Sequence, residues 1–305
     1  MPTWKSILSE IQQEAAQSPL DKIRQKYLRQ VETHTDRNII TYYSGWLDHP
    51  RSGDAAINDR DINALMACVH NMPRAKGLDI VLHTPGGSLA AAEAIVNYLR
   101  ALFPAPKGGG FDIRAIIPQL AMSAGTLIAL SCKAIIMGKH SSLGPIDPQL
   151  SGMPCQGVLD EIEYAMNEIK KDPSQAALWQ PVFAKFNPTF INSCRNAIAW
   201  SESLSAQWLL DNMLINAPNK KKLAQQITRF FSSHETQKHH GRHISTETCR
   251  AQGLFIQDLE ADQQLQDEVL SLHHAYMHTF GNSTAIKIIE NAQGVSIIEK
   301  YPISK

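Results

Sequence analysis

Residues 78–103 read LDIVLHTPGGSLAAAEAIVNYLRALF, and this stretch decides the fold. The short run at residues 78–82 is typical of a buried strand. Pro85-Gly86-Gly87 breaks the strand, and residues 90–103 then have the apolar spacing of a helix. A strand, a glycine turn and a helix in this order form the first part of a parallel β-α-β unit.

The same unit recurs further along the chain. Residues 111–118 predict a strand, Ser123 opens a helix of small residues, and residues 134–137 predict the next strand, from which residues 138–142 turn away. In parallel sheets, functional groups lie beyond the carboxyl ends of the strands. We therefore expect the turn at residues 86–87, Ser123 and residues 139–140 to meet at one edge of the sheet.

The rest of the chain divides near residue 150. On the N-terminal side, the patterns predict a helix over 4–34, a strand over 38–47 and a helix from about residue 58. Downstream, the chain is predicted to be mostly helical, with one short strand near 254–259 and a last helix over 263–279. We place a catalytic core at 1–150 and a helical region at 151–305 that packs on the core and mediates assembly. The alternative is that these helices pack on the sheet as one domain.

Composition narrows the class of protein. The chain has 305 residues, of which 43% are hydrophobic and 19% charged, as in an ordinary soluble globular protein. Lys plus Arg and Asp plus Glu each number 29, so the formal net charge gives no sign of a nucleic-acid partner. No apolar run approaches the roughly 20 residues that span a bilayer, and the N-terminus does not resemble a secretion signal. The five scattered cysteines lack a CxxC pair, which favours reduced thiols in a cytoplasmic protein.

The two turns carry groups suited to acyl transfer. Gly86 and Gly87 let the backbone approach a bound carbonyl with no Cβ in the way. The N–H groups at a helix start are unpaired and partly positive. Ser123 would be the nucleophile, with the N–H groups of Gly87 and Ala124 as the oxyanion hole. Each motif is short, however. The alternative role for Ser123 is structural, as a small residue that allows the helix and the strand to pack closely.

Five segments together carry a resemblance to a known family. The most specific one, residues 137–149, reads MGKHSSLGPIDPQ. The others are HTPGG at 83–87, AMSAGT at 121–126, YYSGW at 42–46 and KIIEN at 287–291. In this arrangement the chain resembles the Clp protease/crotonase superfamily. It is most similar to the signal peptide peptidase-like serine peptidases and, within these, to the serine dehydrogenase proteinase family.

The resemblance implies an α/β fold of stacked β-α-β units with a mostly helical C-terminal half. It also implies an ATP-independent serine endopeptidase that hydrolyses peptide bonds in peptide or protein substrates, with no cofactor and no metal. Ser123 would be the catalytic serine, with Gly86, Gly87 and Ala124 around the oxyanion. Such proteins usually form homo-oligomers, often rings, that enclose their sites.

The general base is the open part of this interpretation, because a serine hydroxyl needs a base to become a good nucleophile. Clp-type enzymes use a histidine and an aspartate, but residues 146–148, where the resemblance places the histidine, read IDP. Signal peptide peptidases use a lysine, but residues 155–157, where that lysine would fall, read CQG. His140, at a strand end on the active edge, is our first candidate. The other candidates are Lys139 and the pair Lys170 and Lys171. For this pair the alternative role is that of charged residues at the end of a helix.

Further alternatives concern the base and the function. Asp147 would orient a base or a substrate amine. Two further alternatives are that the base comes from a neighbouring subunit or that it is absent. The histidine-rich residues 238–243, KHHGRH, are expected to form a solvated loop. Two competing functions remain: a crotonase-like enzyme acting on an acyl thioester, and a non-catalytic scaffold that kept the fold and lost the base.

Overall fold

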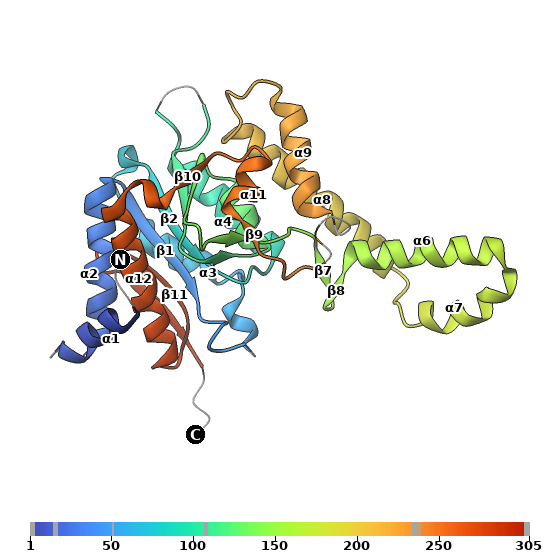
Figure 1. The fold of residues 1–305 in the computed structure, drawn as a ribbon, viewed down its shortest axis with the longest axis horizontal. Coiled ribbons are helices and arrows are strands. Elements are labelled where there is room, and N and C mark those ends of the chain that lie inside the picture. The colour runs from blue at the N-terminus through green and yellow to red at the C-terminus, as the bar shows by residue number, and fades with distance from the viewer. Residues whose placement is uncertain are drawn as a thin grey trace.

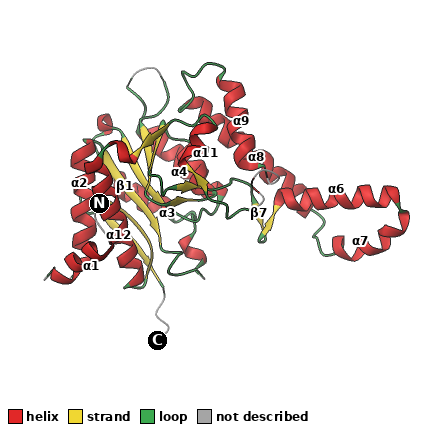
Figure 2. Ribbon diagram, in the orientation of Figure 1, coloured by secondary structure: helices red, strands yellow, loops and turns green. Residues whose placement is uncertain are grey.

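The computed structural model describes residues 4–14, 18–50, 52–106, 109–233, 237 and 239–301. Within these ranges, the main sheet has seven strands in the order β10-β5-β3-β2-β1-β11-β12 (Figure 1). The strands from β10 to β1 are parallel, whereas β11 pairs antiparallel with β1 and β12 antiparallel with β11. The predicted α/β fold of β-α-β units with a largely helical C-terminal half is confirmed (Figure 2).

The strands of the main sheet are β1 Asn38–Ser44, β2 Leu78–His83, β3 Ile113–Ile117, β5 Ala134–Met137, β10 Ile256–Asp258, β11 Ala285–Asn291 and β12 Ser296–Lys300. The short strands β4 Leu120–Ala121, β6 Ser142–Leu143 and β9 Ile244–Ser245 form a second sheet, and β7 Gln149–Leu150 pairs with β8 Met153–Pro154. The sheet therefore takes strands from both sides of residue 150, because β10, β11 and β12 follow the helical stretch.

The α-helices are α1 Trp4–Gln13, α2 Pro19–Thr35, α3 Asp61–Val69, α4 Leu89–Leu102, α5 Ala124–Leu130, α6 Cys155–Lys171, α7 Ala176–Phe183, α8 Phe190–Asp211, α9 Lys220–Ser232, α11 Thr246–Ala251 and α12 Gln263–Gly281. Single 3₁₀ turns lie at η1 Gly53–Ala55, η2 Arg74–Lys76, η3 Pro173–Gln175 and η4 Leu259–Ala261. Residues 4–34 form two helices, α1 and α2, where the sequence predicted one.

Side-chain alternation along the strands gives the sheet two apolar faces. Ile40, Leu82 and Ile289 point to the face covered by α3, α4 and α5, where the largest core cluster lies. Their neighbours, such as Ile39 and Ile288, point to the opposite face, which α2 and α12 cover. Both faces are apolar because each is buried under helices, as expected for a parallel sheet.

Helices α6 and α7 extend away from the body as an arm (Figure 1). In α6, Cys155, Val158 and Ala165 are the buried residues, and α7 has none. Tyr164 and Leu178 are more than half exposed on this arm. None of the described helices is both long and apolar enough to cross a membrane.

A cluster of buried histidine and aromatic rings lies where β2 ends, against α12. Neither ring nitrogen of His83 has a hydrogen-bond partner among the described residues. The His83 ring centroid lies 4.4 Å from that of Trp46 and 5.2 Å from that of His273. Burial lowers the pKa of His83 to about 3 and the pKa of His273 well below its usual value.

These depressed pKa values predict that the protein loses stability in mild acid. The unfolded chain binds a proton at each histidine below about pH 6.5, whereas folded His83 stays neutral down to about pH 3. The free energy of unfolding should therefore fall by about 2 kcal/mol per buried histidine between pH 6.5 and pH 5. Urea unfolding at pH 7, 6 and 5 measures this loss. In the variant His83→Phe, the free energy of unfolding should fall less steeply with acid, because about one proton fewer is taken up on unfolding. An unchanged slope would contradict the account.

Candidate active site

Ser123 occupies a sharp turn between β4 and the start of α5. Its backbone angles are φ 52° and ψ −119°, a region that residues other than glycine rarely adopt. Such strain costs about 1–3 kcal/mol and is concentrated at functional sites. Among the described residues, none makes a hydrogen bond to the Ser123 hydroxyl. The turn thus presents a free hydroxyl at the N-terminus of a buried helix.

The glycine turn after β2 packs directly against this serine. The Met122 N–H donates to the Thr84 carbonyl over 3.0 Å, which ties the two turns together. A Cβ atom at Gly86, where φ is +93°, would lie 2.6 Å from the Ser123 Cβ and 3.0 Å from the Ala124 nitrogen. Glycine is therefore required at residue 86, because any side chain would push the two turns apart.

Two unpaired backbone donors lie at this junction. Within the described ranges, no acceptor is bonded to the N–H of Gly87 or of Ala124, although both belong to the turns that meet at Ser123. The Ala124 N–H opens α5, so it has no acceptor within the helix and carries part of the helix's positive end. Two such donors beside a hydroxyl are the elements of an oxyanion hole.

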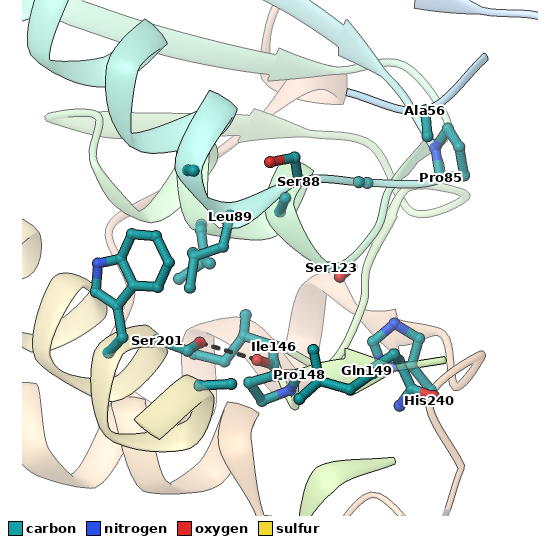
Figure 3. A pocket seen from close by; sticks show the side chains of 18 residues that line it. Ala56, Pro85, Ser88, Leu89, Ser123, Ile146, Pro148, Gln149, Ser201 and His240 are labelled. Atoms are coloured by element: carbon teal, nitrogen blue, oxygen red, sulfur yellow. Dashed lines mark hydrogen bonds between the residues drawn. The ribbon is translucent and has the colours of Figure 1, made fainter. Parts of the chain in front are cut away.

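A pocket of about 600 Å³ opens at the junction of these turns. In Figure 3, Ser123 lies between the segment that carries Pro85 and Leu89 and the segment from Ile146 to Gln149. Gly86, Gly87 and Ala124 also line this pocket. Much of the remaining wall is apolar and is formed by Leu89, Leu127, Ile146, Leu150, Ala197 and Trp200.

A histidine–aspartate pair forms another part of the pocket wall. The Nδ1 atom of His240 lies 2.7 Å from Oδ1 of Asp147, and Asp147 is only 2% exposed. The other carboxylate oxygen of Asp147 accepts a hydrogen bond from Gln149 over 3.1 Å. His240 lines the same pocket as Ser123 (Figure 3).

The carboxylate selects one tautomer of His240. An ionised carboxylate can only accept hydrogen bonds, so Nδ1 of His240 must carry the proton directed at Asp147. In the neutral ring, Nε2 is then left as an acceptor. A histidine held in this way can take a proton from a serine hydroxyl, as in serine hydrolases. The Ser123–His240 hydrogen bond is not formed here, and in unliganded enzymes such bonds are often long.

The other two predicted catalytic residues lie away from this pocket. His140 lines a separate depression with Lys139, Glu260, Gln263 and Gln266, on the side of α12. Lys170 lies in the last turn of α6, the helix that extends away from the body (Figure 1). Thus the structure brings together Gly86, Gly87, Ser123 and Ala124, as the sequence led us to expect, but neither His140 nor Lys170 lines their pocket.

His240 was the group that the sequence did not reveal as a candidate. It lies in the histidine-rich run that we expected to be a solvated loop, whereas its ring is partly buried against Asp147. Asp147 did stand out in the sequence, as a residue able to orient a base. A search for a histidine to pair with that aspartate would have been the available signal. Within the described ranges, no three His, Cys, Asp or Glu side chains are placed to hold a metal ion.

Comparison with known proteins identifies the family. A family model described as ClpP-like SDH-type serine proteinase matches residues 7–197. The chain belongs to this family. The match to this ClpP-like proteinase family includes both turns, Ser123 and Asp147, and ends before His240. The resemblance found in the sequence is therefore confirmed.

Individual relatives of this ClpP-like family member are distant. An uncharacterised protein of Methanocaldococcus jannaschii is 34% identical over 149 residues, which are 47% of this chain and 49% of the relative. A second uncharacterised protein of that organism is 35% identical over 104 residues, 34% of this chain and 33% of the relative. The ATP-dependent Clp protease proteolytic subunit 2 of Streptomyces coelicolor is 26% identical over 53% of this chain and 69% of the relative. The chain thus spans half or less of the two Methanocaldococcus jannaschii proteins. No solved structure gives a significant match.

Proposed function

We propose that the protein is an ATP-independent serine endopeptidase whose nucleophile is Ser123. In this proposal the Ser123 oxygen attacks the carbonyl carbon of the scissile peptide bond. His240 accepts the hydroxyl proton at Nε2 and later gives it to the leaving amine. The negative charge that develops on the carbonyl oxygen is bound by the N–H groups of Gly87 and Ala124. Water then hydrolyses the acyl-enzyme, with His240 again acting as the base.

The observation that carries this proposal is the arrangement of one pocket. Ser123, two unpaired N–H groups and a histidine held by a buried carboxylate all line it. We assign the base to His240 rather than to His140 or Lys170 because His240 alone of these three lines the pocket with Ser123. Membership of a ClpP-like proteinase family supports the same reaction class.

The walls of the pocket indicate the kind of peptide it accepts. Leu89, Leu127, Ile146 and Leu150 surround the space beside Ser123, and the Trp200 ring, 41% exposed, lies at the pocket as well. An apolar wall favours an apolar side chain, since its burial contributes about 25 cal/mol per Å². We therefore propose cleavage next to large apolar residues of the substrate.

This substrate preference predicts the effect of removing Trp200. The variant Trp200→Ala should raise KM for a peptide with leucine or phenylalanine before the scissile bond by about tenfold, with little change in kcat, because it removes binding area that does not touch the reacting atoms. Steady-state kinetics measure both constants. The matched control is Trp179→Ala, which removes a tryptophan of the arm that packs on Tyr164 and Phe183. Equal changes of KM in the two variants would contradict the role of Trp200 in binding the apolar side chain of the substrate.

Peptide hydrolysis itself tests the proposed function. The purified protein should cleave apolar peptides without a nucleotide, and Ser123→Ala should abolish cleavage. Acyl-thioester hydrolysis in place of peptide hydrolysis would favour the crotonase-like alternative. No hydrolysis of either class, with the wild-type protein folded, would favour the non-catalytic scaffold.

We also propose that the protein works in the cytoplasm as a homo-oligomer, with the arm of α6 and α7 in the contacts. Support comes from the arm's Tyr164, Met166 and Leu178, which the described part of the chain leaves more than half exposed. The Clp protease relative is named as a proteolytic subunit, which is consistent with an assembly of subunits.

A further inference from the structure

The glycine turn of the oxyanion hole is held by a neighbouring segment, residues 55–58, which we call the strap. The Ile57 N–H donates to the Gly86 carbonyl over 2.8 Å, and the Ile57 carbonyl accepts from the Ser88 N–H over 2.9 Å. These two bonds bracket Gly87. A Cβ atom at Gly87 would lie 2.4 Å from the Ile57 nitrogen, so the two backbones are in direct contact.

A buried ion pair anchors the strap to the sheet. The Lys287 ammonium, on β11, donates to the Ala56 carbonyl and to Oδ1 of Asp61, each over 2.8 Å. The side chains of Lys287 and Asp61 are both 1% exposed. A buried lysine is rare unless it is paired, because the charge must leave water. Here one of the hydrogen bonds of the Lys287 ammonium goes to a backbone carbonyl of the strap.

Further buried groups hold the same segment. Oδ2 of Asp61 accepts from the Asn58 N–H over 2.9 Å and from the Tyr42 hydroxyl over 2.6 Å. The Ser44 hydroxyl donates to the Ala55 carbonyl over 2.6 Å. Three residues of the strap are therefore fixed by side chains from β1, α3 and β11. The fourth, Ile57, is hydrogen-bonded to the glycine turn.

We infer that Lys287 and Asp61 are positioning residues for the oxyanion hole, acting through the strap on the Gly87 N–H. The inference rests on the proposed function, in which Gly87 binds the oxyanion. Oxyanion donors accelerate a reaction only when they are held in place before the charge develops. A displacement of about 1 Å can cost about 100-fold in rate. Neither residue touches the pocket, so their contribution would appear in kcat.

The chain offers a matched control on the other face of β11. Arg24 and Glu290 form a second buried ion pair, with Nε and Oε1 2.9 Å apart and both side chains 1% exposed. This pair bonds to Thr279 and Tyr276 and makes no contact with the strap. The variants Lys287→Met and Arg24→Met each remove a buried cation and leave a buried carboxylate, so their general effects on stability should be similar.

The first measurement needs no activity. Hydrogen exchange should show faster exchange, by about tenfold or more, at the amides of Ile57 and Ser88 in Lys287→Met, because these two amides donate the bonds between the strap and the glycine turn. Arg24→Met should leave these amides as in the wild type. Equal protection in the two variants would overturn the inference whether or not the protein is a peptidase.

The second measurement uses peptide hydrolysis. Lys287→Met should lower kcat by about 10-fold to 100-fold with KM within twofold, whereas Arg24→Met should change neither by more than about twofold. Should Lys287→Met not fold, the double variant Lys287→Met/Asp61→Asn, which does not leave the buried Asp61 carboxylate without its cation, takes its place with the same expectation. A kcat near the wild-type value in the folded variant would overturn the inference. No hydrolysis by the wild type would instead reject the proposed function.

Discussion

Replacing His240 by glutamine is expected to lower kcat for peptide hydrolysis by about 10²–10⁴-fold, the usual contribution of general acid–base catalysis. Glutamine cannot take up the Ser123 proton, although it can still bond to Asp147. Steady-state kinetics on an apolar peptide measure the loss. The matched control is His239→Gln, because the neighbouring His239 is exposed and accepts a hydrogen bond from the Gly241 N–H.

The control separates catalysis from loop structure. His239→Gln should leave kcat within about twofold of the wild type. Asp147→Asn should lower kcat about as strongly as His240→Gln, since an amide side chain no longer selects the tautomer with a free Nε2. Similar losses in His239→Gln and His240→Gln would show that the loop matters only structurally, and would contradict the assigned base.

Replacing Gly87 by alanine is expected to lower kcat by about 10²–10³-fold, the effect of losing one oxyanion donor. At φ +150°, the added Cβ would lie 2.4 Å from both the nitrogen and the oxygen of Ile57, so the peptide must move. Steady-state kinetics measure kcat, and the midpoint of urea unfolding shows whether the variant is still folded. The control Gly53→Ala adds a methyl group that meets nothing within 4 Å. A folded Gly87→Ala variant with the wild-type kcat would show that this N–H does not bind the oxyanion.

The sequence was sufficient for those parts of the site that are encoded locally. The turn at Gly86 and Gly87 follows one strand and Ser123 follows the next, so the topology of a parallel sheet brings them together. Glycine, serine and a helix start are each visible in a few residues. For this reason the sequence alone predicted that the glycine turn and Ser123 meet at one edge of the sheet, and in the structure Gly87, Ser123 and Ala124 line one pocket.

The pair of Asp147 and His240 was not predictable in the same way, because its two members are far apart in the chain. Asp147 and His240 are separated by 93 positions, and the helices α6 to α9 lie between them. No spacing rule links two residues across such an insertion. His140 was favoured because it directly follows a strand, but its ring lies in the depression beside α12. A polar run with several histidines gave no indication that one of them is partly buried.

The strands β11 and β12 were likewise not predicted. Lys287 and Glu290 place charges within β11, and charged side chains normally indicate an exposed segment. Both are buried here because Asp61 and Arg24 reach them from distant parts of the chain. Local patterns cannot show such pairings, which exist only after the sheet has formed.

The central claim is that Ser123 is a nucleophile activated by His240. The most direct test is labelling with a fluorophosphonate probe, with the adduct located by mass spectrometry and the rate followed from pH 5 to pH 9. We predict one adduct, on Ser123, that is absent in Ser123→Ala and forms at least about 100-fold more slowly in His240→Gln. Absence of any adduct in the folded wild-type protein, or an equal rate in His240→Gln, would contradict the account.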